Sequence, residues 1–248
     1  MRVLGHQGWT DFFSQFGLYN HMYRKYGNAT VMVVQPEQLP FVRRLFFDTG
    51  IDVELADLSP IGSGTCVLCH QTGSPVACPR AGGRCKYPTQ PFVGLCAFDD
   101  YSKWARFRET TMVSFVEAFY IYHDLPASTM YDRFNVKRTP ATEIQHITDV
   151  PYYVYHTQPA FPLRLPRGYA VKLENSSSDF FQSLGLIEHA TEIHLLQSSY
   201  SMFVYLLQLK YGLLSNKSIF VHTYARTNAN TEYRNVNRHP QLPNWTFL

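Results

Sequence analysis

The sequence has little net charge and no long hydrophobic run. Its 22 Lys and Arg residues nearly balance its 19 Asp and Glu residues, and the formal charge of +3 is too small for the basic surface of a nucleic-acid-binding protein. No stretch approaches the roughly 20 apolar residues that a membrane-spanning helix needs. The first residues lack the basic and apolar regions of a secretory signal. We therefore expect a soluble, cytoplasmic protein with no membrane span and no nucleic-acid partner.

Cysteine is scarce and unevenly distributed. The five cysteines are odd in number and confined to one third of the chain, which does not fit a disulfide scaffold. Cys66 and Cys69 have the spacing of a zinc knuckle, whereas the spacing of Cys78 and Cys85 does not match one. A structural zinc ion, free cysteines and a disulfide therefore all remain open for this segment. No set of His and carboxylate residues predicts a catalytic metal.

Hydrophobic residues make up 45% of the chain, which is enough for a buried core. At about 100 to 200 residues per domain, the length allows one large domain or two lobes. Residues 2–5, 30–35 and 52–55 are typical of strands, and helical spacings of apolar residues separate them. This alternation predicts βαβ units on a parallel sheet.

The second half of the chain repeats the alternation. Strands are expected at residues 152–156, 170–173, 192–196 and 218–224, and helices at residues 179–189 and 199–211. In the first half, a stretch rich in Gly, Pro, Ser and Thr predicts a loop insertion at about residues 59–96. The predicted fold class is α/β, with two Rossmann-like lobes around a central cleft. We expect an N-terminal lobe at residues 1–140 and a C-terminal lobe at residues 141–248.

A glycine-containing loop, GHQGWTD at residues 5–11, lies between the first expected strand and the first expected helix. Glycines let a backbone approach a ligand closely, and a helix N-terminus favours negative charge. Because ligands bind outside the carboxyl ends of parallel strands, we expect His6, Gly8, Trp9 and Asp11 at the edge of the cleft. The alternative is that Asp11 only caps the helix and Trp9 only packs.

A second candidate site lies where the strand expected at residues 192–196 runs into a hydroxyl-rich helix start. This point brings together the hydroxyls of Ser198 and Ser199, backbone N–H groups and the helix dipole. The combination predicts a binding site for a diphosphate. A simple serine cap without any ligand is the alternative.

Three segments together resemble a known family. LIEHATEIHLLQSSY at residues 186–200 resembles the segment IE-x-A-x-EIH-x-x-(D/Q)-SS-(F/Y) of small GT-B-like glycosyltransferases found in bacteria and large DNA viruses. HQGWTD at residues 6–11 is similar to their H-x-GLGD loop, and PYYVYH at residues 151–156 to their YVFVH strand. The chain departs from the family at Trp9 and Thr10, which replace Leu-Gly. It departs again after His156, where relatives often carry acidic residues and then an arginine.

The resemblance implies a GT-B-like fold whose C-terminal lobe, similar to that of fucosyltransferases, binds a nucleotide-sugar donor. It implies donor binding by Ser198, Ser199 and Tyr200 of that lobe. We also expect the following residues to contact the donor: His156, Arg164, His194 and Gln197. The phosphate-binding cation is open among His156, Arg164, Arg167 and Lys172, and we expect His156 first and Arg164 second. In the N-terminal lobe the resemblance implies that Asp11 is the catalytic base and that His6, Gly8 and Trp9 bind the acceptor.

The activity that the resemblance implies is an inverting, metal-independent sugar transfer that requires no cofactor. The donor would be a UDP- or GDP-linked deoxyhexose or pentose such as fucose, rhamnose or xylose, and the acceptor an oligosaccharide or glycoprotein glycan. One alternative is a Rossmann-like methyltransferase that uses the loop at residues 5–8 for its cofactor. Others are a non-enzymatic, zinc-stabilised binding module and a transferase-like protein without turnover.

Overall fold

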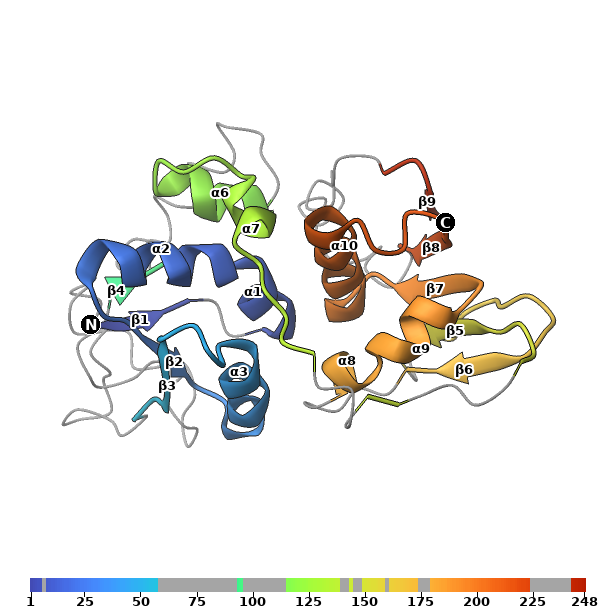
Figure 1. Ribbon diagram of the computed structural model, residues 1–248, viewed down its shortest axis with the longest axis horizontal. Coiled ribbons are helices and arrows are strands. Elements are labelled where there is room, and N and C mark those ends of the chain that lie inside the picture. Colours follow the sequence, from blue (N-terminus) through green and yellow to red (C-terminus); the bar gives the residue numbers. More distant parts are fainter. Residues whose placement is uncertain are drawn as a thin grey trace, which may run out of the picture. The chain divides into compact units, whose positions relative to one another are not determined.

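The computed structural model describes residues 1–5, 8–57, 93–95, 115–138, 143–144, 149–158, 161–173, 179–223 and 242–248. The chain divides into two compact units, Met1–Arg133 and Phe134–Leu248, each of which contains a parallel sheet (Figure 1). The predicted α/β class with parallel sheets is therefore confirmed. The division falls between Arg133 and Phe134, and the sequence prediction placed the boundary near residue 140. The cysteines and most of the expected insertion lie outside the described residues.

The strands of the first unit follow the order β3-β2-β1-β4, and every neighbouring pair is parallel. The strands are β1 (Arg2–Leu4), β2 (Thr30–Val33), β3 (Asp52–Leu55) and β4 (Val93–Gly94). The helices are α1 (Trp9–Ser14), α2 (Phe16–Tyr26), η1 (Pro36–Gln38), α3 (Leu39–Leu45), α6 (Phe115–Tyr122) and α7 (Thr129–Asp132). The predicted βαβ alternation is confirmed over β1, β2 and β3.

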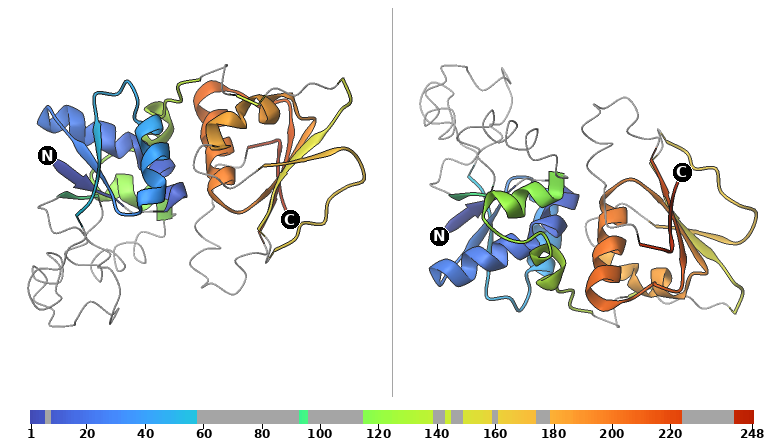
Figure 2. Two further views of the ribbon diagram at one scale, coloured as in Figure 1. Left: turned by 90° about the horizontal axis from the view of Figure 1, so that it is seen from below. Right: turned by 90° about the horizontal axis from the view of Figure 1, so that it is seen from above.

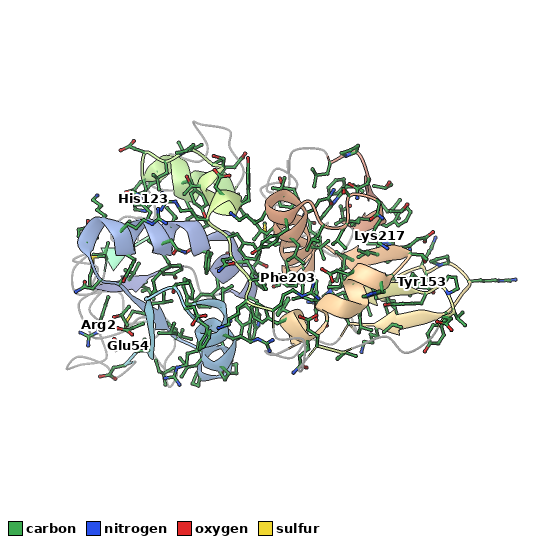
Figure 3. The ribbon with its side chains drawn as sticks, viewed as in Figure 1. Arg2, Glu54, His123, Tyr153, Phe203 and Lys217 are labelled. Atoms are coloured by element: carbon green, nitrogen blue, oxygen red, sulfur yellow. The ribbon has the colours of Figure 1, made fainter. Side chains whose placement is uncertain are left out.

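Aromatic side chains form much of the core of the first unit. Phe16 stacks on Phe46 with ring centroids 4.9 Å apart, and Phe13 meets Phe41 edge to face at 5.1 Å. Such pairs add to the stabilisation that burial of their apolar surface provides. At the surface of the sheet, Arg2 of β1 reaches across β2 to Glu54 of β3 (Figure 3). This exposed ion pair contributes little to stability.

The strands of the second unit follow the order β6-β5-β7-β8-β9, and again all neighbours are parallel. The strands are β5 (Tyr153–His156), β6 (Ala170–Lys172), β7 (Glu192–Leu196), β8 (Ser218–His222) and β9 (Trp245–Phe247). The helices are α8 (Asp179–Gln182), α9 (Leu184–His189) and α10 (Ser199–Tyr211). Figure 2 shows this sheet and its helices from two further sides.

The strand order of the second unit defines a switch point in the sheet. From β5 the chain moves outward to β6 at one edge, and it then returns to the other side of β5 to form β7. The connections that leave β5 and β7 therefore run in opposite directions across the sheet. In open parallel sheets, this is where a crevice forms outside the carboxyl ends of the strands and where ligands bind.

The helices of this unit differ in detail from the prediction. One helix was expected at residues 179–189, and the structure breaks it into α8 and α9 at Ser183. α10 ends, as predicted, at Gly212, which adopts the left-handed conformation with φ 65°. Within the described residues, no helix is long and apolar enough to cross a membrane.

The buried side-chain amide of Gln208 holds β9 in place through hydrogen bonds. Trp245 Nε1 donates a hydrogen bond to Gln208 Oε1 at 2.6 Å, and Gln208 Nε2 donates one to Asn244 Oδ1 at 2.7 Å. Asn244 Nδ2 in turn donates to the carbonyl oxygens of Leu214 and Lys217. A buried polar group is costly unless it is hydrogen-bonded, so these contacts select one position for the segment 242–248.

Replacing Gln208 with Met keeps a similar volume but removes both amide contacts. We expect Gln208→Met to lower the free energy of unfolding of this unit by about 1 to 3 kcal/mol, because Trp245 Nε1 and Asn244 Oδ1 lose their partners. Urea unfolding combined with hydrogen exchange of the β9 amides measures this effect. Lys210→Met, at an exposed position of the same helix, should change the stability by less than about 0.5 kcal/mol. Undiminished protection of β9 in Gln208→Met would contradict the role of Gln208.

Candidate functional site

The switch point of the second unit brings His156 and Ser198 together. His156 is the last residue of β5 and pairs in register with Leu195 of β7. After Leu196 the chain turns through Gln197 into α10. His156 Nδ1 lies 3.0 Å from Ser198 Oγ. Two segments about forty residues apart in the sequence thus place an imidazole and a hydroxyl in hydrogen-bond contact at the carboxyl edge of the sheet.

Ser198 is the N-cap residue of α10, and its backbone is extended with φ −155° and ψ −170°. Its N–H donates to Ser201 Oγ at 3.0 Å, and Ser201 Oγ donates to the Ser198 carbonyl oxygen at 2.7 Å. These two bonds fix the turn that leads into the helix. The first turn of a helix directs backbone N–H groups and the positive end of the dipole outward, so the helix start beside Ser198 favours an anion.

Exposure differs among the residues around this turn. Gln197, Ser198 and Ser199 are half-buried, so part of each reaches the surface, whereas His156 is only 2% exposed. The Gln197 N–H donates to the carbonyl oxygen of His222 at 3.1 Å and ties the turn to β8. A ligand that approaches this edge therefore meets the residues of the turn before the buried imidazole.

Tyr200, which the resemblance places among the donor-binding residues, is 1% exposed. Its ring packs against the His156 ring at a centroid distance of 4.8 Å, and on Phe180 at 4.5 Å. Its hydroxyl lies 3.3 Å from Ser183 Oγ. Tyr200 thus lies beneath the surface at which a ligand would bind and supports His156.

The structure places His194 on the opposite face of the sheet from His156. Side chains alternate along a strand, and the partner of His156 in the register is Leu195. The His194 ring stacks on Phe220 at 4.7 Å and lies next to His222, with Nδ1 3.4 Å from His222 Nε2. Its other nitrogen, Nε2, lies 3.3 Å from Glu192 Oε2. These contacts separate His194 from the Ser198 turn.

Arg164 is exposed and lies in the connection between β5 and β6. Near the start of this connection, Thr157 Oγ1 donates to the carbonyl oxygen of Phe161. Near its end, Tyr153 Oη donates to the carbonyl oxygen of Pro166 at the amino end of β5. Arg164 therefore lies in the connection between these two contacts, and its role at the Ser198 turn stays a prediction.

The candidate residues of the first unit lie at the start of α1. The Gly8 N–H donates to Asp11 Oδ2 at 2.9 Å, and the Trp9 ring lies edge-on to Phe41 with centroids 5.1 Å apart. Both contacts fit the alternative in which Asp11 caps the helix and Trp9 packs. A Cβ at Gly8 would come within 2.7 Å of Asp11 Oδ2, so the capping contact favours glycine. His6 lies outside the described residues.

Several residues that build the site gave no functional signal in the sequence. Ser201 and Ser183 were predicted only as parts of helices, and their roles depend on contacts with Ser198 and Tyr200.

Glu188, part of the segment that resembles the family, binds Arg138 through both carboxylate oxygens at 2.8 Å. Arg138 also binds the buried carboxylate of Glu143. Glu188 thus helps to fix the chain that precedes β5.

The arrangement at Ser198 suits the binding of an anionic oxygen. It combines a serine hydroxyl, an imidazole and the N-terminus of a helix, which are groups that bind phosphate in proteins. Among the residues that the structure describes, no group of three or more His, Cys, Asp or Glu side chains could hold a metal ion. The cysteines for which a zinc ion remained open are not among those residues.

The comparisons with known proteins do not assign the chain to a family. No protein-family model matches the sequence, and neither a curated protein nor a solved structure shows a significant match. The resemblance noted from three short segments therefore stays a prediction.

The contact between His194 and His222 predicts how stability depends on pH. Burial, followed by the neighbouring His194, lowers the pKa of His222 below its usual value of 6.5. The unfolded chain then binds more protons than the folded chain at acidic pH, so the free energy of unfolding should fall as the pH drops below about 6.5. The fall should end below the folded-state pKa.

Replacing His222 with Gln removes the titrating group and keeps a side chain that can donate to His194. We expect the free energy of unfolding of the wild type to fall relative to that of His222→Gln as the pH falls from 7.5 to 5. Urea unfolding at each pH measures this difference. Burial also lowers the pKa values of His21 and His123. Both proteins contain these histidines, so their contributions cancel in the difference between the two free energies of unfolding. A difference that is independent of pH would contradict the account of His222.

Proposed function

We propose that this protein is a nucleotide-sugar-dependent glycosyltransferase with a two-lobe GT-B-like architecture. The observation that carries the proposal is the contact between Ser198 Oγ and His156 Nδ1 at the switch point between β5 and β7. It falls on two of the three segments that resemble the family, and it lies where parallel sheets bind nucleotides. The donor diphosphate is the ligand that this position and chemistry favour.

The second unit binds the donor in this proposal. Ser198 and Ser199 donate hydrogen bonds to diphosphate oxygens, and the N-terminus of α10 adds its dipole. If His156 Nδ1 carries a proton and donates to Ser198 Oγ, the serine hydroxyl keeps its own proton for the phosphate. Gln197 lies beside them and contacts the same ligand. His194 has no direct role, because it lies on the other face of the sheet.

The first unit supplies the base. Asp11 takes the proton of an acceptor sugar hydroxyl while the hydroxyl oxygen forms a bond to the anomeric carbon of the donor. The bond from that carbon to the diphosphate breaks, and the diphosphate leaves with the electron pair toward Ser198 and Ser199. The configuration at the anomeric carbon is inverted. A carboxylate has about four lone-pair sites, so the bond from Gly8 is compatible with this role and orients the group.

The resemblance guides the choice of substrates. The donor class is a UDP- or GDP-linked deoxyhexose or pentose, such as fucose, rhamnose or xylose. The acceptor is an oligosaccharide or glycoprotein glycan, which His6, Gly8 and Trp9 would contact. The transfer requires no separate cofactor, because hydroxyl groups, the imidazole and the helix dipole stabilise the leaving diphosphate.

The contact between Ser198 and His156 also suits a second candidate function, hydrolysis with Ser198 as nucleophile. A catalytic serine is activated by a histidine within hydrogen-bond reach. However, the nucleophile of α/β-hydrolases sits on a sharp, strained turn, whereas Ser198 has an extended backbone. Covalent labelling of Ser198 by a fluorophosphonate would favour hydrolysis over sugar transfer.

The role of Ser198 in donor binding is tested by removing its hydroxyl. We expect Ser198→Ala to weaken the binding of UDP or GDP by about tenfold or more, because a hydrogen bond to a charged group contributes about 1.5 to 3 kcal/mol. Isothermal titration calorimetry measures the affinity. Ser215→Ala is the matched control, since Ser215 is exposed beyond the C-terminus of α10 and its hydroxyl donates to the nearby carbonyl oxygen of Gly212. Equal affinities for all three proteins would move the donor site elsewhere.

The role of Asp11 is tested by a neutral side chain of the same shape. Asp11→Asn can still accept the bond from the Gly8 N–H, so we expect the fold and the affinity for UDP or GDP to be preserved. The rate of sugar transfer should fall by about 10² to 10⁴, the usual contribution of a general base. Product formation from a panel of UDP- and GDP-sugars measures the rate. An Asn variant as active as wild type would exclude Asp11 as the base.

A further inference from the structure

A row of three packed rings, those of His156, Tyr200 and Phe180, lies next to Ser198. The His156 ring packs on Tyr200 with centroids 4.8 Å apart and planes tilted by 41°, and Tyr200 packs on Phe180 at 4.5 Å and 33°. Phe180 also meets Phe203 of α10, which Figure 3 labels, edge-on at 5.9 Å. The row thus joins β5, α10 and α8.

Packing limits the movement of each member of this row. His156, Tyr200 and Phe180 are 2%, 1% and 5% exposed. Close-packed interiors leave few voids, so a buried ring keeps its orientation only while its neighbours fill the space around it. The orientation of the His156 ring determines where Nδ1 lies and therefore where Ser198 Oγ is held.

The hydroxyl of Tyr200 adds a second constraint. It lies 3.3 Å from Ser183 Oγ, and both side chains are buried. Ser183 is the residue at which the chain turns from α8 into α9. A phenylalanine would fill the same space as Tyr200, so the hydroxyl pair is not needed for packing. The contact joins Tyr200 to the turn between α8 and α9.

We infer that Tyr200 is a positioning residue of the donor site, which acts through its ring and His156 on the Ser198 hydroxyl. This inference rests on the proposed function for its ligand, and it changes the role of Tyr200 from ligand contact to support. As the second residue of α10, Tyr200 also holds the start of the helix whose N-cap is Ser198.

The test compares substitutions at two buried tyrosines of the same helix. Tyr200→Leu removes the ring beneath His156, whereas Tyr205→Leu removes a ring that is equally buried but packs on Trp245 at 5.7 Å. Tyr200→Phe keeps the ring and loses only the hydroxyl. Chemical unfolding of each full-length variant shows whether the two Leu variants lose similar stability.

Two readouts are measured on these variants. Calorimetry with UDP and GDP should give an affinity about tenfold weaker for Tyr200→Leu, because the hydrogen bond from the Ser198 hydroxyl to the nucleotide is lost. Tyr205→Leu should bind like wild type, and Tyr200→Phe within about threefold of it, a smaller loss than that of one full hydrogen bond. The ¹⁵N signals of the His156 ring should change in Tyr200→Leu and remain those of wild type in Tyr205→Leu.

The outcomes distinguish this inference from the proposed function. If wild type binds neither UDP nor GDP, the proposed function fails, and the His156 signals still decide whether Tyr200 positions the ring. Unchanged His156 signals and unchanged affinity in Tyr200→Leu would overturn the inference. So would equal losses of affinity in Tyr200→Leu and Tyr205→Leu, because the effect would then follow stability alone.

Discussion

The candidate site depends on the parallel register between β5 and β7. In this register His156 lies opposite Leu195, so its side chain points to the face of the sheet that α10 covers, where Tyr200 packs against it. A shift of one residue would turn His156 to the other face, since side chains alternate along a strand. The contact with Ser198, the support from Tyr200 and the separation from His194 all follow from this pairing.

The local part of this arrangement was predictable from the sequence. Alternating apolar patterns predicted parallel sheets, and two serines ahead of an apolar helical stripe predicted the N-cap of α10 at Ser198 and Ser199, where the structure has it at Ser198. These features depend on the periodicity and capping preferences of neighbouring residues. The end of α10 at Gly212 was predictable for the same reason, because glycine readily adopts the left-handed conformation.

The features that could not be predicted from the sequence depend on contacts between distant segments. His194 was predicted to bind the donor together with Ser198, within the segment that resembles the family, but the face on which a strand residue lies is decided by its pairing with other strands. Arg138 binds a carboxylate fifty residues further along, and β9 is fixed by Gln208 on another element. The break at Ser183 interrupts a helix that was expected to be continuous over residues 179–189. Contacts between distant segments complete such arrangements and can override local preference.

The most direct test of the account is an NMR titration of the full-length protein, labelled at its histidine side chains, with UDP and with GDP. His156 and His194 belong to neighbouring strands but to opposite faces of one sheet, so each serves as the reference for the other. The account predicts a saturable shift of the His156 ring signals with one of the two nucleotides, while the His194 signals remain in place. Shifts confined to His194, or no shift of His156 at saturating nucleotide, would contradict it.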